Sequence, residues 1–279
     1  MLESTRHLDI PLELSIMSSS ESHLIAEMSS ANPHVLVVTI NRPPANPLTL
    51  AMFNQLTEIF NSIHTRKDVR AVVITGSGNR IFCAGADVKE INKRTVESSF
   101  DRSIIYRACF DAISRCAVPV VGAINGSALG AGMVLAACCD FVIATEGARF
   151  GVPEINVGSM GGTRHAGSMV PDSMMRYMAL TGETLSVDDL YRVGSVLKVL
   201  PSDEVLPEAV KIASGIAGKA PKMVRMMREA INLTGDMPVY EGYRLEQLFT
   251  NVAVALPESK EASQAFLEKR APNFDTPAE

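Results

Sequence analysis

The sequence has no dense block of lysine and arginine and no long uncharged apolar run. Its 279 residues carry 26 basic and 31 acidic side chains, for a net charge of −5. That balance argues against nucleic acid as the main partner and provides no basic patch for a membrane surface. Because no uncharged apolar run reaches the roughly 18 residues that a membrane span requires, we expect no membrane partner.

The cysteines and histidines form no recognisable metal pattern. The five cysteines are odd in number and lack zinc-ligand spacing, so we interpret them as reduced, buried thiols: Cys83, Cys109, Cys116, Cys138 and Cys139. The five histidines are scattered, and no metal site is predicted. The Walker phosphate loop and the G-x-G-x-x-G fingerprint are absent as well, which disfavours a dinucleotide oxidoreductase.

The first residues lack the features of a secretory signal. The stretch "MLESTRHLDIPLELSIMSSSES" has no basic start, no apolar stretch and no small-residue cleavage site. We therefore interpret residues 1–21 as a flexible N-terminal extension and expect a cytoplasmic protein. The remaining length suits one large domain, or a domain with an appended subdomain.

Apolar runs separated by helical patterns predict an α/β core. Four runs that end in turn residues are expected as strands: residues 34–40, 69–78, 119–130 and 138–145. Residues 50–63 place apolar side chains at helical spacing, and residues 130–138 form an alanine-rich helix. Such runs are buried on both faces, which indicates a sheet with much parallel or mixed pairing.

The C-terminal part is predicted to be helical. Six segments have helical patterns: residues 172–182, 186–194, 205–218, 221–233, 239–256 and 259–270. We expect the core to occupy residues 22–210 and a helical subdomain to occupy residues 211–279.

Three glycine-rich junctions are candidates for a binding site: residues 82–90, 124–132 and 149–162. Small residues let a ligand approach the backbone and leave N–H groups pointing outward. Two such groups suit a developing oxyanion, although on the glycine pattern alone simple tight turns are the favoured explanation. In "RFGVPEINVGSMGG" the acid Glu154 has no cation beside it before Arg164, so it is either a solvated loop residue or a carboxylate held in a dry place.

Three segments, in this order, resemble the crotonase (enoyl-CoA hydratase/isomerase) family: "NRPPANPLTLAMFNQL", "FCAGADVKE" and "AINGSALGAGMVLAACCDFVIATEGARFGVPEINVG". The similarity continues to "SKEASQAFLEKRAPNF" and covers residues 22–274. It implies a crotonase-type ββα spiral core followed by a helical C-terminal trimerisation subdomain. It further implies a substrate carried as a coenzyme A (CoA) thioester, no permanently bound cofactor, and a homotrimer or a dimer of trimers.

The resemblance also implies roles for single positions. The backbone N–H groups of Ala86 and Ala131 would bind the thioester oxygen, and Glu154 would act as acid and base. The implied CoA contacts are the carbonyl of Ala84 at the adenine, Ala45, Pro47, Leu48 and Asp87 along the channel, Lys269 and Arg270 at the phosphates, and Phe266 near a neighbouring subunit's site.

Two features depart from the family pattern. Val134 stands where hydratases carry a second glutamate, and a valine can neither orient nor deprotonate water. The glycines after Glu154 come sooner than usual, which shortens the pocket wall. His165 and Asp87 are the nearby replacements for the missing acid, although a helix-start histidine and a turn-capping aspartate are the simpler interpretations.

We therefore expect an enoyl-CoA enzyme that isomerises in preference to hydrating, because one base suffices to carry a proton from C2 to C4. A decarboxylase, hydrolase or C–C lyase acting on a branched, cyclic or aromatic acyl-CoA is the alternative, since the same oxyanion site serves each reaction. A non-catalytic acyl-CoA-binding homologue is a third reading, which Val134 favours and Glu154 disfavours.

Overall fold

The computed structural model describes residues 23–274, so the extension expected over residues 1–21 lies outside the described residues. This part of the chain holds ten strands: β1 (Leu24–Ser29), β2 (Asn32–Ile40), β3 (Ala71–Gly76), β4 (Ile81–Cys83), β5 (Val120–Ile124), β6 (Ser127–Leu129), β7 (Phe141–Thr145), β8 (Arg149–Gly151), β9 (Leu185–Ser186) and β10 (Val196–Leu200).

The same residues hold eleven α-helices: α1 (Leu50–Ser62), α2 (Val88–Ile91), α3 (Val96–Ser114), α4 (Ala131–Ala137), α5 (Thr163–Ala166), α6 (Asp172–Thr181), α7 (Val187–Arg192), α8 (Ser202–Ala217), α9 (Pro221–Thr234), α10 (Val239–Val254) and α11 (Pro257–Glu268). A 3-10 helix, η1 (Pro153–Val157), follows β8. Between residues 23 and 274 no helix is both long enough and apolar enough to cross a bilayer.

The larger sheet is mostly parallel, as predicted. Its strand order is β1-β2-β3-β5-β7-β10. The strands from β2 to β10 pair in parallel, and β1 pairs antiparallel with β2. The apolar run 119–130 divides into β5 and β6 at Gly126, where a methyl group would overlap the backbone of Arg80.

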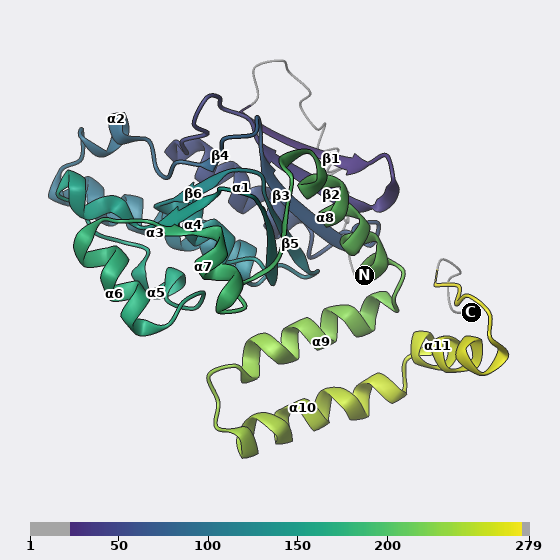
Figure 1. The fold of residues 1–279 in the computed structure, drawn as a ribbon. Coiled ribbons are helices and arrows are strands. Elements are labelled where there is room, and N and C mark those ends of the chain that lie inside the picture. Colours follow the sequence, from purple (N-terminus) through teal and green to yellow (C-terminus); the bar gives the residue numbers. More distant parts are fainter. Residues whose placement is uncertain (1–22, 275–279) are drawn as a thin grey trace, which may run out of the picture.

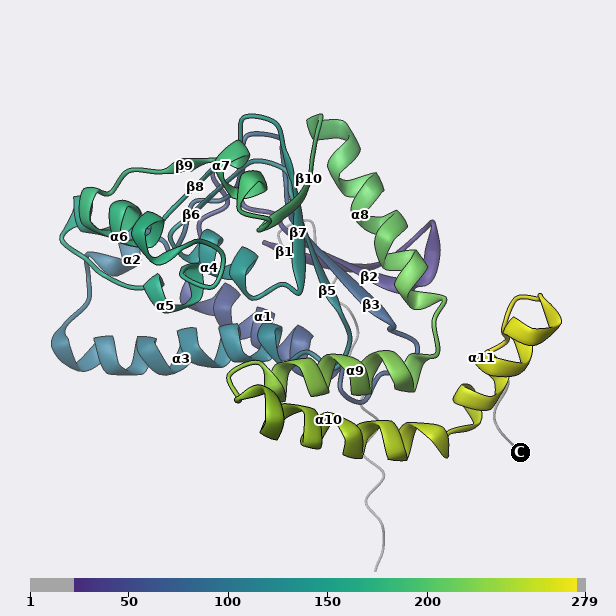
Figure 2. The same cartoon turned by 60° about the horizontal axis from the view of Figure 1, so that its bottom comes forward.

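Side chains of the larger sheet alternate between two apolar layers. Val72 and Ile74 of β3 pack in the layer that contains α1, α3 and α4, whereas Ala71 and Val73 pack under α8. Figure 2 shows α8 on one side of the sheet and α1 and α3 on the other. This alternation is the two-residue period of a strand, and burial on both faces explains the continuous apolar runs of the sequence.

The smaller sheet is built from strands that directly follow those of the larger one. Its order is β4-β6-β8-β9, in which β4, β6 and β8 are parallel and β9 is antiparallel. Short turns lead from β3 to β4, from β5 to β6 and from β7 to β8. Each pair therefore gives one strand to each sheet before a helix follows, and the predicted ββα core with a helical C-terminal part is confirmed.

Helices α9, α10 and α11 project away from the sheets (Figures 1 and 2). They pack against one another. The boundary expected between residues 210 and 211 falls inside α8, whose Val205, Ala209 and Ala213 pack on the larger sheet. That boundary needs correction, because α8 belongs to the core and the projecting helices begin at Pro221.

Two arginines of α9 attach these projecting helices to the core. Arg228 Nε donates to Asp140 at 2.8 Å, and its Nη2 donates to the Ser114 carbonyl at 3.0 Å, where α3 ends. Arg225 Nη2 donates to the Arg66 carbonyl at 2.6 Å, just beyond α1. Cationic donors at helix C-termini satisfy orphan carbonyls and complement the helix dipoles.

We expect Arg228→Met to lower the free energy of unfolding by about 2–4 kcal/mol, because it leaves Asp140 and several carbonyls without their buried donor. The Arg228 side chain is only 6% exposed. Urea unfolding followed by circular dichroism measures the change. Arg176→Met breaks a fully exposed pair with Asp172 and should leave the midpoint unchanged. Equal midpoints for the two variants would show that α9 is held by other contacts.

Candidate active site

The three parallel strands of the smaller sheet end side by side. β4 leads into Gly85 and Ala86, β6 leads into Gly130 and Ala131, and β8 leads into Glu154. Because the carboxyl ends of parallel strands lie at the same edge of a sheet, these segments meet there. The sheet therefore gathers residues from the three glycine-rich junctions that the sequence singled out.

Glycines make this meeting close. A methyl group at Gly85 would lie 3.4 Å from the Ala131 nitrogen, and one at Gly132 would overlap the Cys83 carbonyl. Gly130 has a φ of 54°, and a methyl group there would lie 2.8 Å from Glu154 Oε1. Larger residues would push the segments apart, so the glycines bring the carboxylate to the two alanines.

The N–H groups of Ala86 and Ala131 donate no hydrogen bond within residues 23–274. Ala86 pairs with Leu48, but the bonds run from Leu48 N to Gly85 O and from Asp87 N to Leu48 O, both at 2.8 Å. The N–H of Ala86 itself therefore points away from Leu48. Ala131 is the first residue of α4, where N–H groups lack intrahelical partners and the helix dipole is positive.

The residues predicted to line the CoA channel lie next to this cluster. Ala84 N donates to the Ala45 carbonyl at 3.0 Å, and the next residue along, Gly85, accepts from Leu48 N. Arg42 Nη1 donates to the Pro47 carbonyl at 3.1 Å. The structure thus places residues 45–48 along residues 84–87, while contact with CoA stays a prediction.

Glu154 lies in the first turn of η1 with its carboxylate partly buried. Its Oε2 is buried and has no hydrogen-bond partner in the described part of the chain. Burial raises the pKa of Glu154 above its ordinary value, because the charged form loses hydrating water and a backbone hydrogen bond offsets only part of that loss. The reading of Glu154 as a solvated loop residue is therefore wrong.

Val134 is buried in α4 and packs below the segment that follows Glu154. A methyl group at Gly162 would lie 2.7 Å from Val134 Cγ2 and 3.8 Å from Val152 Cγ1. The glycines that follow Glu154 sooner than in the family pattern thus let the chain pass directly over Val134. An apolar contact occupies the position where the family pattern has a second acid.

Of the two nearby candidates for that second acid, Asp87 is held in a cap and an ion pair, and His165 lies in a short helix. Asp87 caps α2 through Lys89 N at 2.8 Å and accepts from Arg42 Nη1 at 2.7 Å. The Arg42 hydrogen bond lowers the pKa of Asp87, which stays an ionised structural group. His165 lies in the single turn of α5, with its ring 5.5 Å from that of Phe110. The simpler interpretations of both residues are confirmed, and Arg42 was missed because its partner lies 45 residues away.

The three residues predicted near the C-terminus do not join the cluster within this chain. Phe266, Lys269 and Arg270 belong to α11 or follow it, and α11 packs against α9 and α10 (Figure 1). Arg270 already pairs with Glu261 and Glu268, and its hydrogen bond lowers the pKa of Glu261 to about 2. The phosphate contacts of Lys269 and Arg270, and the place of Phe266 near a neighbouring subunit's site, stay predictions.

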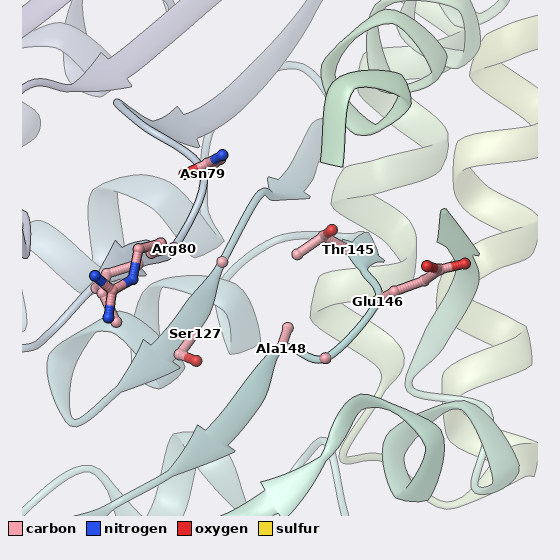
Figure 3. Close-up of a pocket in the computed structure, with 9 residues that line it drawn as sticks. Asn79, Arg80, Ser127, Thr145, Glu146 and Ala148 are labelled. Atoms are coloured by element: carbon pink, nitrogen blue, oxygen red, sulfur yellow. The ribbon is translucent and has the colours of Figure 1, made fainter. Parts of the chain in front are cut away.

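A separate polar pocket of about 330 Å³ lies at the opposite, amino ends of β4, β6 and β8. Figure 3 shows residues around it from the turns after β3 and β7 and from the adjoining ends of β6 and β7: Asn79, Arg80, Ser127, Thr145, Glu146 and Ala148. The two sites are thus at opposite ends of the same strands. No group of three or more metal-ligating side chains occurs in residues 23–274.

Comparison with known proteins gives consistent matches. The family model described as enoyl-CoA hydratase/isomerase matches residues 30–277. A mitochondrial enoyl-CoA hydratase of Pongo abelii is 33% identical over 256 residues, which cover 90% of this chain and 87% of the relative. A crystal structure of an enoyl-CoA hydratase from Mycobacterium smegmatis superposes with a TM-score of 0.86 and 31% identity, covering 92% of this chain and 100% of the other.

A further relative has a different printed activity. The (7aS)-7a-methyl-1,5-dioxo-2,3,5,6,7,7a-hexahydro-1H-indene-carboxyl-CoA hydrolase of Mycobacterium tuberculosis is 32% identical over 238 residues, covering 84% of this chain and 96% of the relative. Similarity at this level therefore fixes the scaffold and leaves several thioester reactions open.

The raised pKa of Glu154 predicts a specific pH dependence of stability. Between the unfolded and folded pKa values the folded protein binds the proton more tightly, so the contribution of Glu154 to the free energy of unfolding falls as pH rises. Glu154→Gln removes this contribution. We expect the variant to gain stability over the wild type as pH is raised from about 4 to 7, measured by urea unfolding at each pH.

Glu183→Gln makes the same change at an exposed position and should give a flat difference over that range. A flat difference for Glu154→Gln as well would contradict a desolvated carboxylate.

Proposed function

This chain is an acyl-CoA enzyme of the enoyl-CoA hydratase/isomerase family, and we propose that it forms an enolate of its thioester substrate with Glu154 as the base. The observation that carries the proposal is the meeting of a partly buried carboxylate, whose Oε2 has no hydrogen-bond partner in the described residues, with two backbone N–H groups that donate to no acceptor there. Unsatisfied buried polar groups are costly, and active sites are where proteins keep them. A carboxylate oxygen and two N–H groups without protein partners suit a ligand that has both a removable proton and an oxygen that becomes negatively charged.

The two N–H groups stabilise the charge of the enolate. Removing a proton from C2 of a thioester moves negative charge onto the carbonyl oxygen. Ala86 N–H and Ala131 N–H donate to that oxygen, and they need no reorganisation because the strands fix them. Losing one such donor typically costs about 3–4 kcal/mol of transition-state stabilisation.

Glu154 carries the proton. As a carboxylate it removes a proton from C2, and as the resulting acid it returns that proton to C4, while the double bond moves from the 3,4 to the 2,3 position. Burial suits this cycle, because a raised pKa brings the acid and base forms closer in free energy near neutral pH. One group serves both steps, because removing the proton from C2 leaves Glu154 in the acid form that then protonates C4.

Isomerisation is preferred over hydration because Val134 supplies no second carboxylate. Hydration requires a group that orients and deprotonates water, and Val134 is buried against Gly162 instead. Asp87 is held by Arg42 and cannot replace it. We expect 3-enoyl-CoA to be converted into 2-enoyl-CoA faster than 2-enoyl-CoA is hydrated.

A second candidate is hydrolysis, decarboxylation or C–C cleavage of a branched, cyclic or aromatic acyl-CoA. The relative from Mycobacterium tuberculosis, whose printed name is that of a hydrolase of a ring-containing carboxyl-CoA, supports this reading. We propose that the short return over Val134 changes the wall beside Glu154, which would suit a substrate other than a straight chain. A non-catalytic acyl-CoA-binding role is the third candidate.

Exchange of the C2 hydrogens tests the enolate directly. We expect wild-type protein in D₂O to place deuterium at C2 of saturated straight-chain acyl-CoAs, detected by mass spectrometry. Glu154→Gln should slow the exchange by about 10²–10⁴-fold, and Glu183→Gln should leave it unchanged. The same samples report free CoA, CO₂ loss and chain cleavage, which would identify the second candidate.

Exchange that is unimpaired in Glu154→Gln would remove Glu154 from the mechanism. Tight thioester binding by the wild type with no exchange and no product would instead establish the non-catalytic role.

The projecting helices are proposed to assemble the protein into a homotrimer or a dimer of trimers. α9 and α10 carry apolar side chains that stay exposed, and a groove of about 350 Å³ lies between Met226, Leu248, Phe249 and Val252. Apolar surface of this kind marks interaction sites. A neighbouring copy on this surface also explains why Phe266, Lys269 and Arg270 lie apart from the cluster of their own chain.

Leu248→Glu tests the assembly. We expect the wild type to have three or six times the chain mass by light scattering, and Leu248→Glu to shift the mass toward that of one chain. A charge in a buried apolar contact costs several kcal/mol. Leu197→Glu, at a leucine of β10 that is 53% exposed, is the matched control. A wild-type protein that runs as a monomer contradicts the assembly.

A further inference from the structure

The first half of α3 has its polar and apolar faces reversed. Val96, Phe100 and Ile104 lie on one face and are 81%, 71% and 57% exposed. Arg102 lies on the inward face, where its side chain is only 14% exposed. A helix on a folded core normally turns apolar residues inward and arginine outward. Something other than core packing therefore explains the inward arginine.

Arg102 is not satisfied by the residues around it. Its Nε and Nη1 are buried and lack a hydrogen-bond partner in the described part of the chain. The closest carboxylate oxygen, Glu90 Oε2, is 3.8 Å from Nη1, which is beyond hydrogen-bond distance. That oxygen already accepts from Leu50 N at 3.0 Å. Glu90 thus offsets the charge of Arg102 but leaves its N–H donors open.

The segment that carries Arg102 borders the candidate active site on two sides. On one side, Glu90 Oε2 accepts a hydrogen bond from the N–H of Leu50. Leu50 lies two residues after Leu48, which pairs with Ala86. At the other side Arg94 Nη1 donates to Ser159 Oγ at 3.1 Å. Ser159 N in turn donates to the Glu154 carbonyl at 3.0 Å. Residues 88–102 therefore extend between the oxyanion side and the Glu154 side of the cluster.

We propose that Arg102 is a specificity-determining residue that binds an oxo group on the acyl chain of the substrate. The inference rests on the proposed function, because the acyl chain of a thioester bound between Ala86 and Glu154 would leave C2 toward this segment. A guanidinium offers several N–H donors in a fixed plane, which suits a carbonyl oxygen. A neutral acceptor fits better than a carboxylate, since Glu90 already supplies the negative charge nearby and would repel a second one.

Equilibrium binding of saturated thioesters tests this assignment without requiring any chemistry. The probes are octanoyl-CoA and its 4-, 5-, 6- and 7-oxo derivatives, which differ from it by one oxygen in place of two hydrogens. We expect the wild type to bind one oxo derivative about 10- to 100-fold more tightly than octanoyl-CoA. In Arg102→Met that ratio should fall to about one, and Arg102→Lys should retain part of it.

Arg107→Met is the matched control, because it removes an exposed arginine from the same helix and should keep the wild-type ratio. Each variant is judged by the ratio of its affinities for the oxo derivative and for octanoyl-CoA. A general loss of folding or of CoA binding lowers both affinities and cancels in this ratio. No oxo preference in the wild type, or a preference that survives in Arg102→Met, overturns the assignment. Tighter binding of 8-carboxyoctanoyl-CoA than of every oxo derivative also overturns it, in favour of an anionic acyl group.

The outcomes separate this inference from the proposed function. An oxo preference that depends on Arg102, in a protein without C2 exchange, supports Arg102 and removes the enolate chemistry. C2 exchange that depends on Glu154, with no oxo preference, supports the enolate chemistry and removes the assignment of Arg102.

Discussion

The parallel alignment of β4, β6 and β8 is the constraint on which the candidate site depends. Each strand is only three residues long, yet pairing in parallel fixes where all three end. Glycines at positions 85, 130 and 132 then allow the following segments to approach closely. Backbone geometry thus brings Ala86 and Ala131 together, and Glu154 adds a carboxylate beside them.

The site leaves polar groups unsatisfied, and the rest of the fold compensates for that cost. Glu154 Oε2 and the N–H groups of Ala86 and Ala131 lack partners within residues 23–274, which lowers stability. Apolar layers on both faces of the larger sheet provide the opposing stabilisation. The cost is concentrated where a ligand can supply the missing hydrogen bonds, which is the usual trade between stability and function.

The sequence alone predicted the elements whose pattern reflects burial, and it missed those whose pattern does not. β3 and α1 follow directly from their apolar spacing. β4 and β8 are too short to show a period, and α3 was missed because Val96, Phe100 and Ile104 face outward. The boundary between residues 210 and 211 failed because the spacing of α8 does not reveal which surface it packs on.

The candidate site was foreseen through family resemblance more than through physics. The positions of the glycines located the junctions, but only the resemblance paired Ala86 with Ala131 and gave Glu154 its role. The structure brings these residues together, while their roles and the CoA contacts stay predictions. Arg102 had no signal in the sequence, because its burial depends on how α3 lies on the core.

A crystal structure with a non-hydrolysable acyl-CoA analogue bound tests the central claim most directly. The account predicts that the oxygen replacing the thioester carbonyl lies within hydrogen-bond distance of both Ala86 N and Ala131 N, with C2 facing the Glu154 carboxylate. An analogue whose carbonyl lies elsewhere, or a Glu154 carboxylate turned into solvent in that complex, would contradict it.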